Sequence, residues 1–120
     1  MMQFCDVPVY LHREVVDFRK SINGLSVIVE ESLLMSPMQT GLFVFCNRRR
    51  DKLKVLYWDS TGYCLWYKRL EDARFKWPRQ GENKWVLTQE QFDWLLRGFD
   101  ISQIQAHSPL FFGENDPLKA

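Results

Sequence analysis

The sequence has few of the residues that build metal centres and no long apolar run. It contains two histidines and three cysteines (Cys5, Cys46 and Cys64), and none of them follows the spacing of a metal-ligand motif. An odd number of widely separated cysteines is typical of free thiols in a reducing compartment. No apolar stretch approaches the ~18–20 residues of a membrane span, and the first residues lack the pattern of a secretory signal. We therefore expect a cytoplasmic protein with no metal, no cofactor, no small-molecule substrate and no membrane partner.

A recognisable catalytic constellation is also missing. The six glycines are scattered singly, so the sequence has no glycine-rich loop that could hold phosphates. His12 and His107 stand far apart and outside any cysteine–histidine motif. The acidic pairs Glu30-Glu31 and Glu71-Asp72 are adjacent in sequence, and neighbours on a strand point in opposite directions. We therefore expect that the protein is not an enzyme.

The charge of the chain is distributed unevenly, although its net value is only +1. Residues 1–46 carry three basic and five acidic groups, residues 47–80 carry ten and four, and residues 81–120 carry three and six. The middle segment therefore has a formal charge of +6 between two acidic flanks. A partner responds to this local potential rather than to the total.

At 120 residues and 46% apolar composition the chain fits a single α+β domain over residues 1–104, followed by an irregular tail over residues 105–120. We expect an antiparallel sheet of four to five strands. Residues 7–11 predict an edge strand, because Pro8 cannot donate to a ladder. The remaining strands are expected at 42–46, 52–59 and 63–70, which form a central meander, with a short edge strand at 74–77.

Two amphipathic helices are expected to pack on one face of this sheet. Asp17 is the predicted N-cap of the first helix, and Gly24 in its middle predicts that another element packs close to it. Thr88 caps the second helix, Gln91 completes a capping box, and Gly98 suits its C-terminal end. The apolar stripes of the two helices are Phe18, Ile22, Leu25, Val29 and Leu33, and then Phe92, Leu95, Leu96 and Phe99.

The turn at residues 59–62 suggests which side chains of the meander share a face. A type I turn with Gly62 in the left-handed position places Lys54 and Trp58 on one face with Trp66 and Lys68. Lysines at the margin of a tryptophan-bearing face can bind phosphates and stack on bases. An ordinary half-buried sheet has the same composition, so both interpretations stay open.

The run Arg48-Arg49-Arg50 is a better candidate for phosphate contact. It follows the apolar strand at 42–46 and falls in a predicted loop. An exposed arginine cluster is costly to hold together without an anion, and arginine is suited to phosphate. A solvated charged loop is the alternative.

Four segments resemble one family of transposon-encoded proteins. They are residues 9–11 (VYL), 17–25 (DFRKSINGL), 41–59 (GLFVFCNRRRDKLKVLYWD) and 62–70 (GYCLWYKRL). The family is the accessory protein TnpB of insertion-sequence family sixty-six, which is unrelated to the RNA-guided nuclease of the same name. The positions that match its recurrent residues are Asp17, Arg19, Lys20, Gly24, Asn47, Arg48, Arg49, Lys52, Lys54, Trp58, Asp59, Gly62, Trp66, Lys68 and Arg69.

The resemblance implies a bacterial protein that helps transposition without being the strand-transfer enzyme, so no catalytic residue is carried over. We expect it to be encoded between a small helix-turn-helix protein and a large DDE-type transposase, with transposon-end DNA and that transposase as partners. The candidate DNA-binding residues are Arg48, Arg49, Arg50, Lys52, Lys54, Trp58, Trp66, Lys68 and Arg69. Two alternatives stay open: an adaptor that binds the transposase without contacting DNA, and a nuclease without a recognisable motif.

Overall fold

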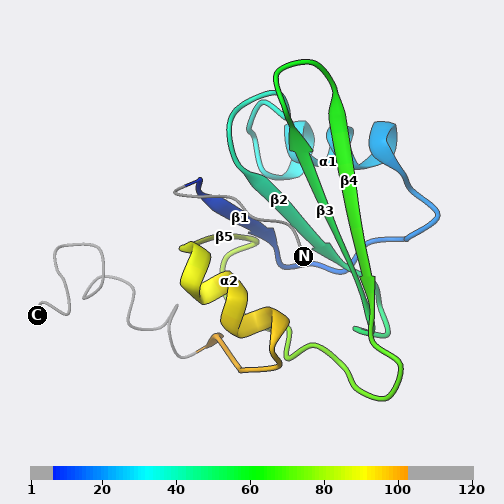
Figure 1. Ribbon diagram of the computed structural model, residues 1–120, viewed down its shortest axis with the longest axis vertical. Coiled ribbons are helices and arrows are strands. Elements are labelled where there is room, and N and C mark those ends of the chain that lie inside the picture. The colour runs from blue at the N-terminus through cyan, green and yellow to red at the C-terminus, as the bar shows by residue number, and fades with distance from the viewer. Residues whose placement is uncertain (1–6, 103–120) are drawn as a thin grey trace, which may run out of the picture.

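The computed structural model describes residues 7–102 and forms one five-stranded sheet with two helices (Figure 1). The predicted domain end at residue 104, the tail, Cys5 and His107 lie outside the described residues. The strands are β1 (Val9–His12), β2 (Leu42–Cys46), β3 (Lys52–Trp58), β4 (Tyr63–Arg69) and β5 (Lys84–Leu87), and their order in the sheet is β4-β3-β2-β1-β5. The predicted α+β class is confirmed.

The antiparallel meander of β2, β3 and β4 is also confirmed, but the sheet as a whole is mixed. β1 pairs in parallel with β2 and antiparallel with β5. The parallel pair arises because helix α1 (Ile22–Ser32) connects β1 to β2 as a crossover, and such a connection returns the chain in the same direction. A purely antiparallel sheet was therefore the wrong prediction.

Two expectations about edge strands were wrong. β1 lies inside the sheet, because Pro8 precedes the strand and only its carbonyl is used, as acceptor for the Leu42 amide at 3.0 Å. The edges are β4 and β5. Residues 74–77 form no strand: they run irregularly, and their Phe75 and Trp77 side chains are buried in the core.

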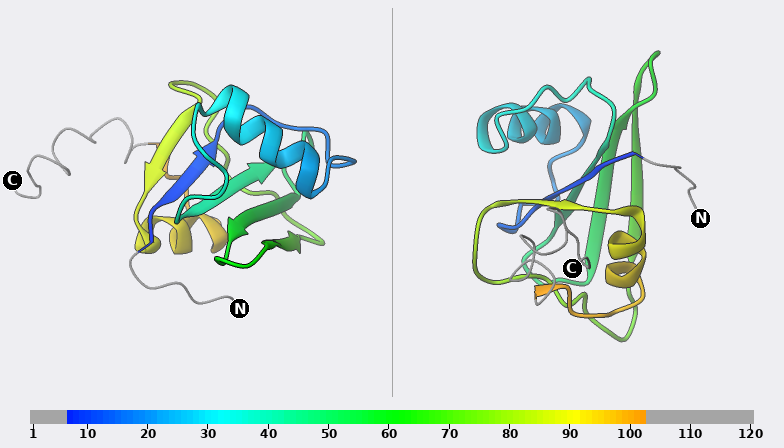
Figure 2. Two further views of the ribbon diagram at one scale, coloured as in Figure 1. Left: turned by 90° about the horizontal axis from the view of Figure 1, so that it is seen from above. Right: turned by 90° about the vertical axis from the view of Figure 1, so that its left-hand side faces the viewer.

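The two helices cover opposite faces of the sheet, which corrects the prediction of one shared face. All five residues of β2 are buried, and they alternate between two core clusters. Val44 and its same-face neighbours pack with Phe92 and Leu95 of α2 (Gln89–Leu96), whereas Phe43 and Phe45 pack with α1. The sheet lies between α1 and α2 in the left view of Figure 2. A continuous apolar strand is what burial on both faces requires.

The second helix follows its local sequence. The Thr88 hydroxyl accepts from the Gln91 amide at 3.1 Å, and the Gln91 side chain accepts from the Thr88 amide at 2.9 Å, so the capping box is confirmed. Gly98, at φ +97°, follows the helix end. Phe99 lies beyond that end and is 56% exposed, so it is not part of the apolar face as predicted.

The first helix begins later than predicted, at Ile22 after Ser21, and Asp17 does not cap it. Its carboxylate instead accepts from the Arg19 amide at 2.9 Å and pairs with the Arg19 guanidinium, which holds residues 17–20 in a turn. Gly24 does meet a close neighbour, but the neighbour is that turn. A Cβ at position 24 would lie 2.9 Å from the Cβ of Lys20.

Candidate nucleic-acid interface

The predicted lysine–tryptophan face is not formed, because the β3–β4 register differs by one residue from the prediction. Trp66 pairs with Val55, and Trp58 pairs with Tyr63, so the two tryptophans lie on opposite faces. Trp66 packs against the α2-side core, whereas Trp58 makes an edge contact with Tyr63 at 5.1 Å between ring centroids. A slip of one residue moves every side chain of a strand to the other face.

The turn itself explains the slip. Asp59 to Gly62 is a four-residue connection in which Ser60, at φ +78°, takes the left-handed position that was assigned to Gly62. The Asp59 carboxylate accepts from the amides of Thr61 and Gly62, both at 3.0 Å. An Asx side chain that satisfies the turn amides stabilises this conformation without glycine at the left-handed position.

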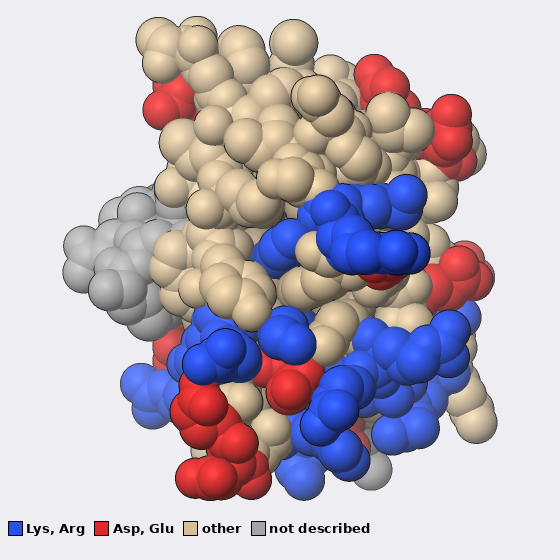
Figure 3. All heavy atoms as spheres, turned by 90° about the vertical axis from the view of Figure 1, so that its right-hand side faces the viewer, with Lys and Arg blue, Asp and Glu red and all other residues tan. Residues whose placement is uncertain are grey.

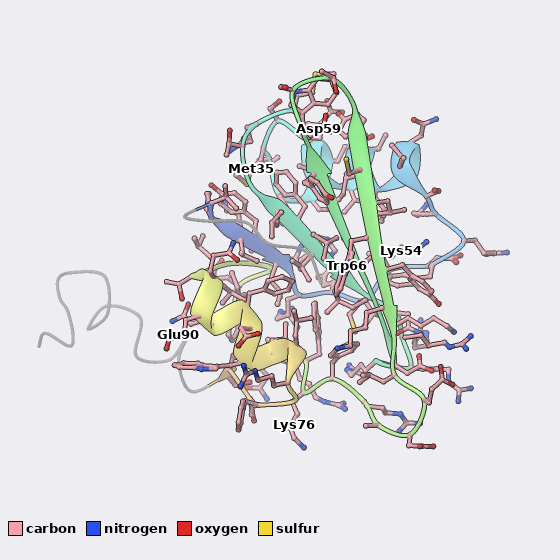
Figure 4. The ribbon with its side chains drawn as sticks, in the orientation of Figure 1. Met35, Lys54, Asp59, Trp66, Lys76 and Glu90 are labelled. Carbon is pink, nitrogen blue, oxygen red and sulfur yellow. The ribbon has the colours of Figure 1, made fainter. Side chains whose placement is uncertain are left out.

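Lys54 is occupied by a structural contact. Its Nζ donates to the carbonyl oxygens of Phe18 at 3.0 Å and of Lys20 at 2.9 Å, and it lies 4.8 Å from the centroid of the Phe18 ring. Burial lowers the pKa of this ammonium group. Lys54 therefore ties the 17–20 turn to β3, and this contact uses two carbonyls that a longer α1 would have needed. Figure 4 labels Lys54 between the strands and the segment that leads to α1.

The β2–β3 loop, residues 47–51, is closed mainly by the Asn47 side chain, and its arginine side chains add only one long hydrogen bond, from Arg50 to the Arg48 carbonyl at 3.3 Å. The buried Asn47 side chain accepts from the Lys52 amide at 2.9 Å and donates to the Asp51 carboxylate at 2.8 Å. This hydrogen bond from Asn47 is the main reason that the pKa of Asp51 is lowered. Arg50, at φ +63°, donates its amide to the Asn47 carbonyl at 3.0 Å. Arg48 and Arg49 consequently project from a fixed loop and are exposed.

A hollow of about 740 Å³ lies between this loop and the 17–20 turn. Arg48, Arg49 and Lys52 line it together with Arg19, and Asp17 is the one acidic residue of its lining. Lys54 also lines it, so the structure brings together four of the candidate residues, although the Lys54 ammonium group is already bound to two carbonyls. Lys68 and Arg69 do not line this hollow, and Arg69 pairs with Glu71 at 2.9 Å.

Two further hollows lie around the loop. One, of about 530 Å³, is lined by three basic residues (Arg49, Arg74 and Lys76) and three acidic ones (Asp51, Glu71 and Asp72). The other, of about 700 Å³, is predominantly basic and is lined by Arg50, Arg74, Lys76 and Arg79. Figure 3 shows Lys and Arg gathered on the half of the molecule that holds these segments. Sequence reasoning did not name Arg19, Arg74, Lys76 and Arg79 as site residues. The density of basic residues over 69–79 was the available signal for the last three.

Within residues 7–102 there is no group of three or more potential metal ligands, and none of the helices there is long and apolar enough to cross a membrane. His12 is buried, with Nδ1 2.8 Å from the Glu14 carbonyl oxygen. Burial raises the pKa of the Cys46 thiol to about 12, so this thiol is protonated at neutral pH.

Comparison with known proteins gives a family and two curated relatives. The family described as IS66 Orf2 like protein matches residues 7–106. The protein y4jC of Sinorhizobium fredii is 36% identical over 90 residues, which cover 75% of this chain and 77% of that protein. The protein y4hO of the same organism is 35% identical over 95 residues, which cover 79% and 83%. No solved structure gives a significant match.

Proposed function

Because this chain belongs to the family of IS66 Orf2-like proteins, as its sequence resemblance predicted, we propose that it is a non-catalytic accessory protein of transposition that contacts DNA. Family membership fits an accessory role in an insertion sequence. The contact is assigned to the basic end, which is the 17–20 turn, residues 47–52 and residues 69–79. The observation that carries this assignment is the lining of the 740 Å³ hollow, where three arginines and two lysines stand against a single acidic residue.

Two cations of this hollow are already engaged, because Arg19 pairs with Asp17 and Lys54 donates to two carbonyls. The other three are available to a ligand. Within residues 7–102, Arg48 and Lys52 form no ion pair. Arg49 has Asp51 at 3.9 Å, but its side chain is 73% exposed, and a pair at that distance and exposure is weak. Phosphates of a nucleic acid would replace these solvated contacts by charge-assisted hydrogen bonds and release counterions.

The proposed contact is with the DNA backbone, so it does not read sequence. Trp58 and Trp66 are not included, because they are half-buried on opposite faces of the sheet. Lys54 is not included either, because its ammonium group is bound to two carbonyls. Arg48, Arg49 and Lys52 are the principal phosphate contacts in this proposal.

Binding of a labelled transposon-end duplex and of a scrambled duplex at several salt concentrations tests the proposal. We expect similar affinities for both, and a decrease of log K with log salt of about 0.9 for each phosphate contact, so roughly 2.7 for three. Arg97→Gln is a matched control, because Arg97 lies beyond α2, pairs with Asp93 and lines none of the three hollows. Adding Mg²⁺ to the same mixtures and looking for cleaved DNA tests for a nuclease.

The adaptor alternative has an observation of its own at the other end of the molecule. Leu34 is 82% exposed and Met38 is 56% exposed, and both lie in the connection between α1 and β2. Exposed apolar side chains of this kind suit contact with a protein. A protein that retains the transposase in a pull-down but binds neither duplex at low salt would be an adaptor, and the DNA proposal would be wrong.

A further inference from the structure

The hollow of about 700 Å³ on the far side of the β2–β3 loop has the composition of an anion site. It is lined by Arg50, Arg74, Lys76 and Arg79, and Asp100 is the one acidic residue of the lining. The Asp100 carboxylate already accepts from the Ser102 amide at 2.9 Å. Arg74, Lys76 and Arg79 are exposed and form no ion pair within residues 7–102. Four cations around a single carboxylate give the hollow an excess of positive charge.

Arg50 is incompletely satisfied in this arrangement. Its Nε is buried and has no acceptor among the described residues, and its Nη1 reaches only the Arg48 carbonyl at 3.3 Å. A buried N–H without an acceptor is unfavourable, and a guanidinium group favours a planar oxyanion or a phosphate. The backbone of Arg50 is also in the left-handed region, at φ +63°, which non-glycine residues rarely adopt. Because Arg50 lines the hollow, an acceptor that enters there would satisfy this donor once the guanidinium group turns toward it.

The walls of the hollow are fixed by hydrogen bonds to backbone carbonyls, and none of these bonds uses the charged side-chain groups of the four cations. The Trp77 indole donates to the Arg13 carbonyl at 2.7 Å, and the Trp85 indole donates to the Glu82 carbonyl at 2.8 Å. Arg13 in turn donates to the carbonyl of Arg79 at 2.9 Å. The Phe75 amide donates to the Arg50 carbonyl at 2.7 Å, which joins the segment to the β2–β3 loop. A site that is formed before its ligand arrives loses less entropy on binding.

We propose that this hollow binds a phosphoryl group, with Arg50 as its central donor and Arg74, Lys76 and Arg79 as its surrounding cations. The inference rests on the proposed function, because the phosphate is assigned to the nucleic acid that the basic end contacts. The intermediate hollow shares Arg49 with the first hollow and Arg74 and Lys76 with this one. Asp51, Glu71 and Asp72 also line the intermediate hollow. A nucleic-acid backbone that contacts both outer hollows would therefore pass three cations beside three carboxylates. A free phosphate or nucleotide presents the same oxygens and is the other possible source.

The side-chain Nε–H signal of Arg50 in a proton–nitrogen NMR spectrum reports directly on this site. A buried N–H exchanges slowly with water, and the loss of one signal in Arg50→Lys assigns it. The full-length protein is titrated at constant ionic strength with inorganic phosphate, with a single-stranded oligonucleotide that has a 5′-hydroxyl, and with the same oligonucleotide bearing a 5′-phosphate. Sodium chloride is the control for simple screening. A larger effect of the 5′-phosphate would identify a terminal phosphate as the ligand.

We expect the Arg50 signal to move and saturate with phosphate and with the oligonucleotides, but not with chloride. Arg50→Lys should weaken phosphate binding roughly tenfold, since it removes the guanidinium donors and keeps the charge. Arg74→Gln and Arg79→Gln should each weaken it about two- to fivefold, and Arg97→Gln should leave it unchanged.

Two results separate this site from the proposed function. An Arg50 signal that no phosphate compound moves, in a protein that still binds duplex DNA, overturns the phosphoryl site and leaves the basic-end contact in place. A signal that saturates with inorganic phosphate in a protein that binds no DNA supports the site, overturns the DNA proposal and identifies free phosphate compounds as the source of the ligand.

Discussion

The loops at the two ends of strand β3 are closed in the same way but differ in their charge. At one end Asn47 closes the β2–β3 loop by accepting the Lys52 amide, and at the other Asp59 closes the β3–β4 turn by accepting two amides. The first loop carries three arginines, whereas the turn at residues 59–62 contains no Lys or Arg. Residues 21–46, which form α1, its connection and β2, contain none either. Asp59 and Lys76 lie at opposite ends of the molecule in Figure 4. Loop closure is thus common to both ends, and charge is what separates them.

Removing the side chain that closes the basic loop should have the largest effect on stability. Asn47→Ala leaves the Lys52 amide and the Asp51 carboxylate without their partner at a buried position. We expect a loss of about 2 kcal/mol in the free energy of unfolding, measured by chemical denaturation. Asp59→Ala, in an exposed turn, is the comparison and should cost less. Equal losses at the two ends would show that burial of Asn47 does not matter.

Lys54 and Lys52 lie two residues apart on β3, and replacing each by methionine should affect different properties: stability for Lys54 and DNA binding for Lys52. Lys54→Met removes the tether to the 17–20 turn, so we expect a loss of roughly 1 kcal/mol of stability and little change in DNA binding. Lys52→Met should keep stability and lower the salt dependence of DNA binding by about 0.9. Denaturation and binding curves on both variants decide this. A Lys54→Met protein of unchanged stability would contradict the structural role.

The Lys54 contact also shows which parts of the fold the sequence could predict. Helix α2 has its cap within three residues, so Thr88 and Gln91 were sufficient to place its start. The start of α1 follows the 17–20 turn, which Asp17 and Arg19 hold locally. Lys54 ties that turn to β3 from a position 34 to 36 residues away, and no local pattern contains this contact. The faces of β3 and β4 were assigned wrongly for a different reason, which lies within the β3–β4 turn itself. Ser60, not Gly62, has the left-handed conformation, and this changes the register by one residue.

The part of the candidate site that is local in sequence was predictable, and the part that tertiary packing brings together was not. Arg48 and Arg49 lie in one short loop and Lys52 begins the strand that follows it, so their proximity follows from the sequence alone. Arg74, Lys76 and Arg79 join the basic end because Phe75 and Trp77 are buried and fix an irregular segment beside Arg50. That path is set by tertiary packing, and a periodic pattern does not reveal it.

At the other end of the molecule, replacing Leu34 should raise stability rather than lower it. It follows α1 at φ +57°, where glycine is usual, and it is 82% exposed. Leu34→Gly should relieve the strain and stabilise the protein by about 0.5–1 kcal/mol in a thermal melt. If this end binds the transposase, the same variant should bind it less well. A loss of stability would mean that Leu34 makes contacts that outweigh its backbone strain.

The smallest expected effect concerns the charge of Asp59. Hydrogen bonds from the Thr61 backbone and side chain are the largest causes that lower its pKa from 3.8. A lowered folded-state pKa contributes stability above the unfolded pKa, and this contribution is lost as the pH falls through the folded value. Wild type should therefore melt slightly above Asp59→Asn at pH 7, and the difference should disappear in acid below the ordinary aspartate pKa. A difference that does not change with pH would exclude the carboxylate charge as its cause.

The salt dependence of DNA binding by a protein with Arg48, Arg49 and Arg50 all replaced by alanine tests the central claim most directly. These side chains do not close the loop, so the circular dichroism melt should be nearly unchanged. Binding of transposon-end and scrambled duplexes should weaken about equally. The slope of log K against log salt should flatten by about 1.8 for the two principal contacts removed, and by up to roughly 2.7 when Arg50 also contacts a phosphate. An unchanged slope with an intact fold would contradict the account, and the arginine loop would then be a solvated turn on a protein-binding adaptor.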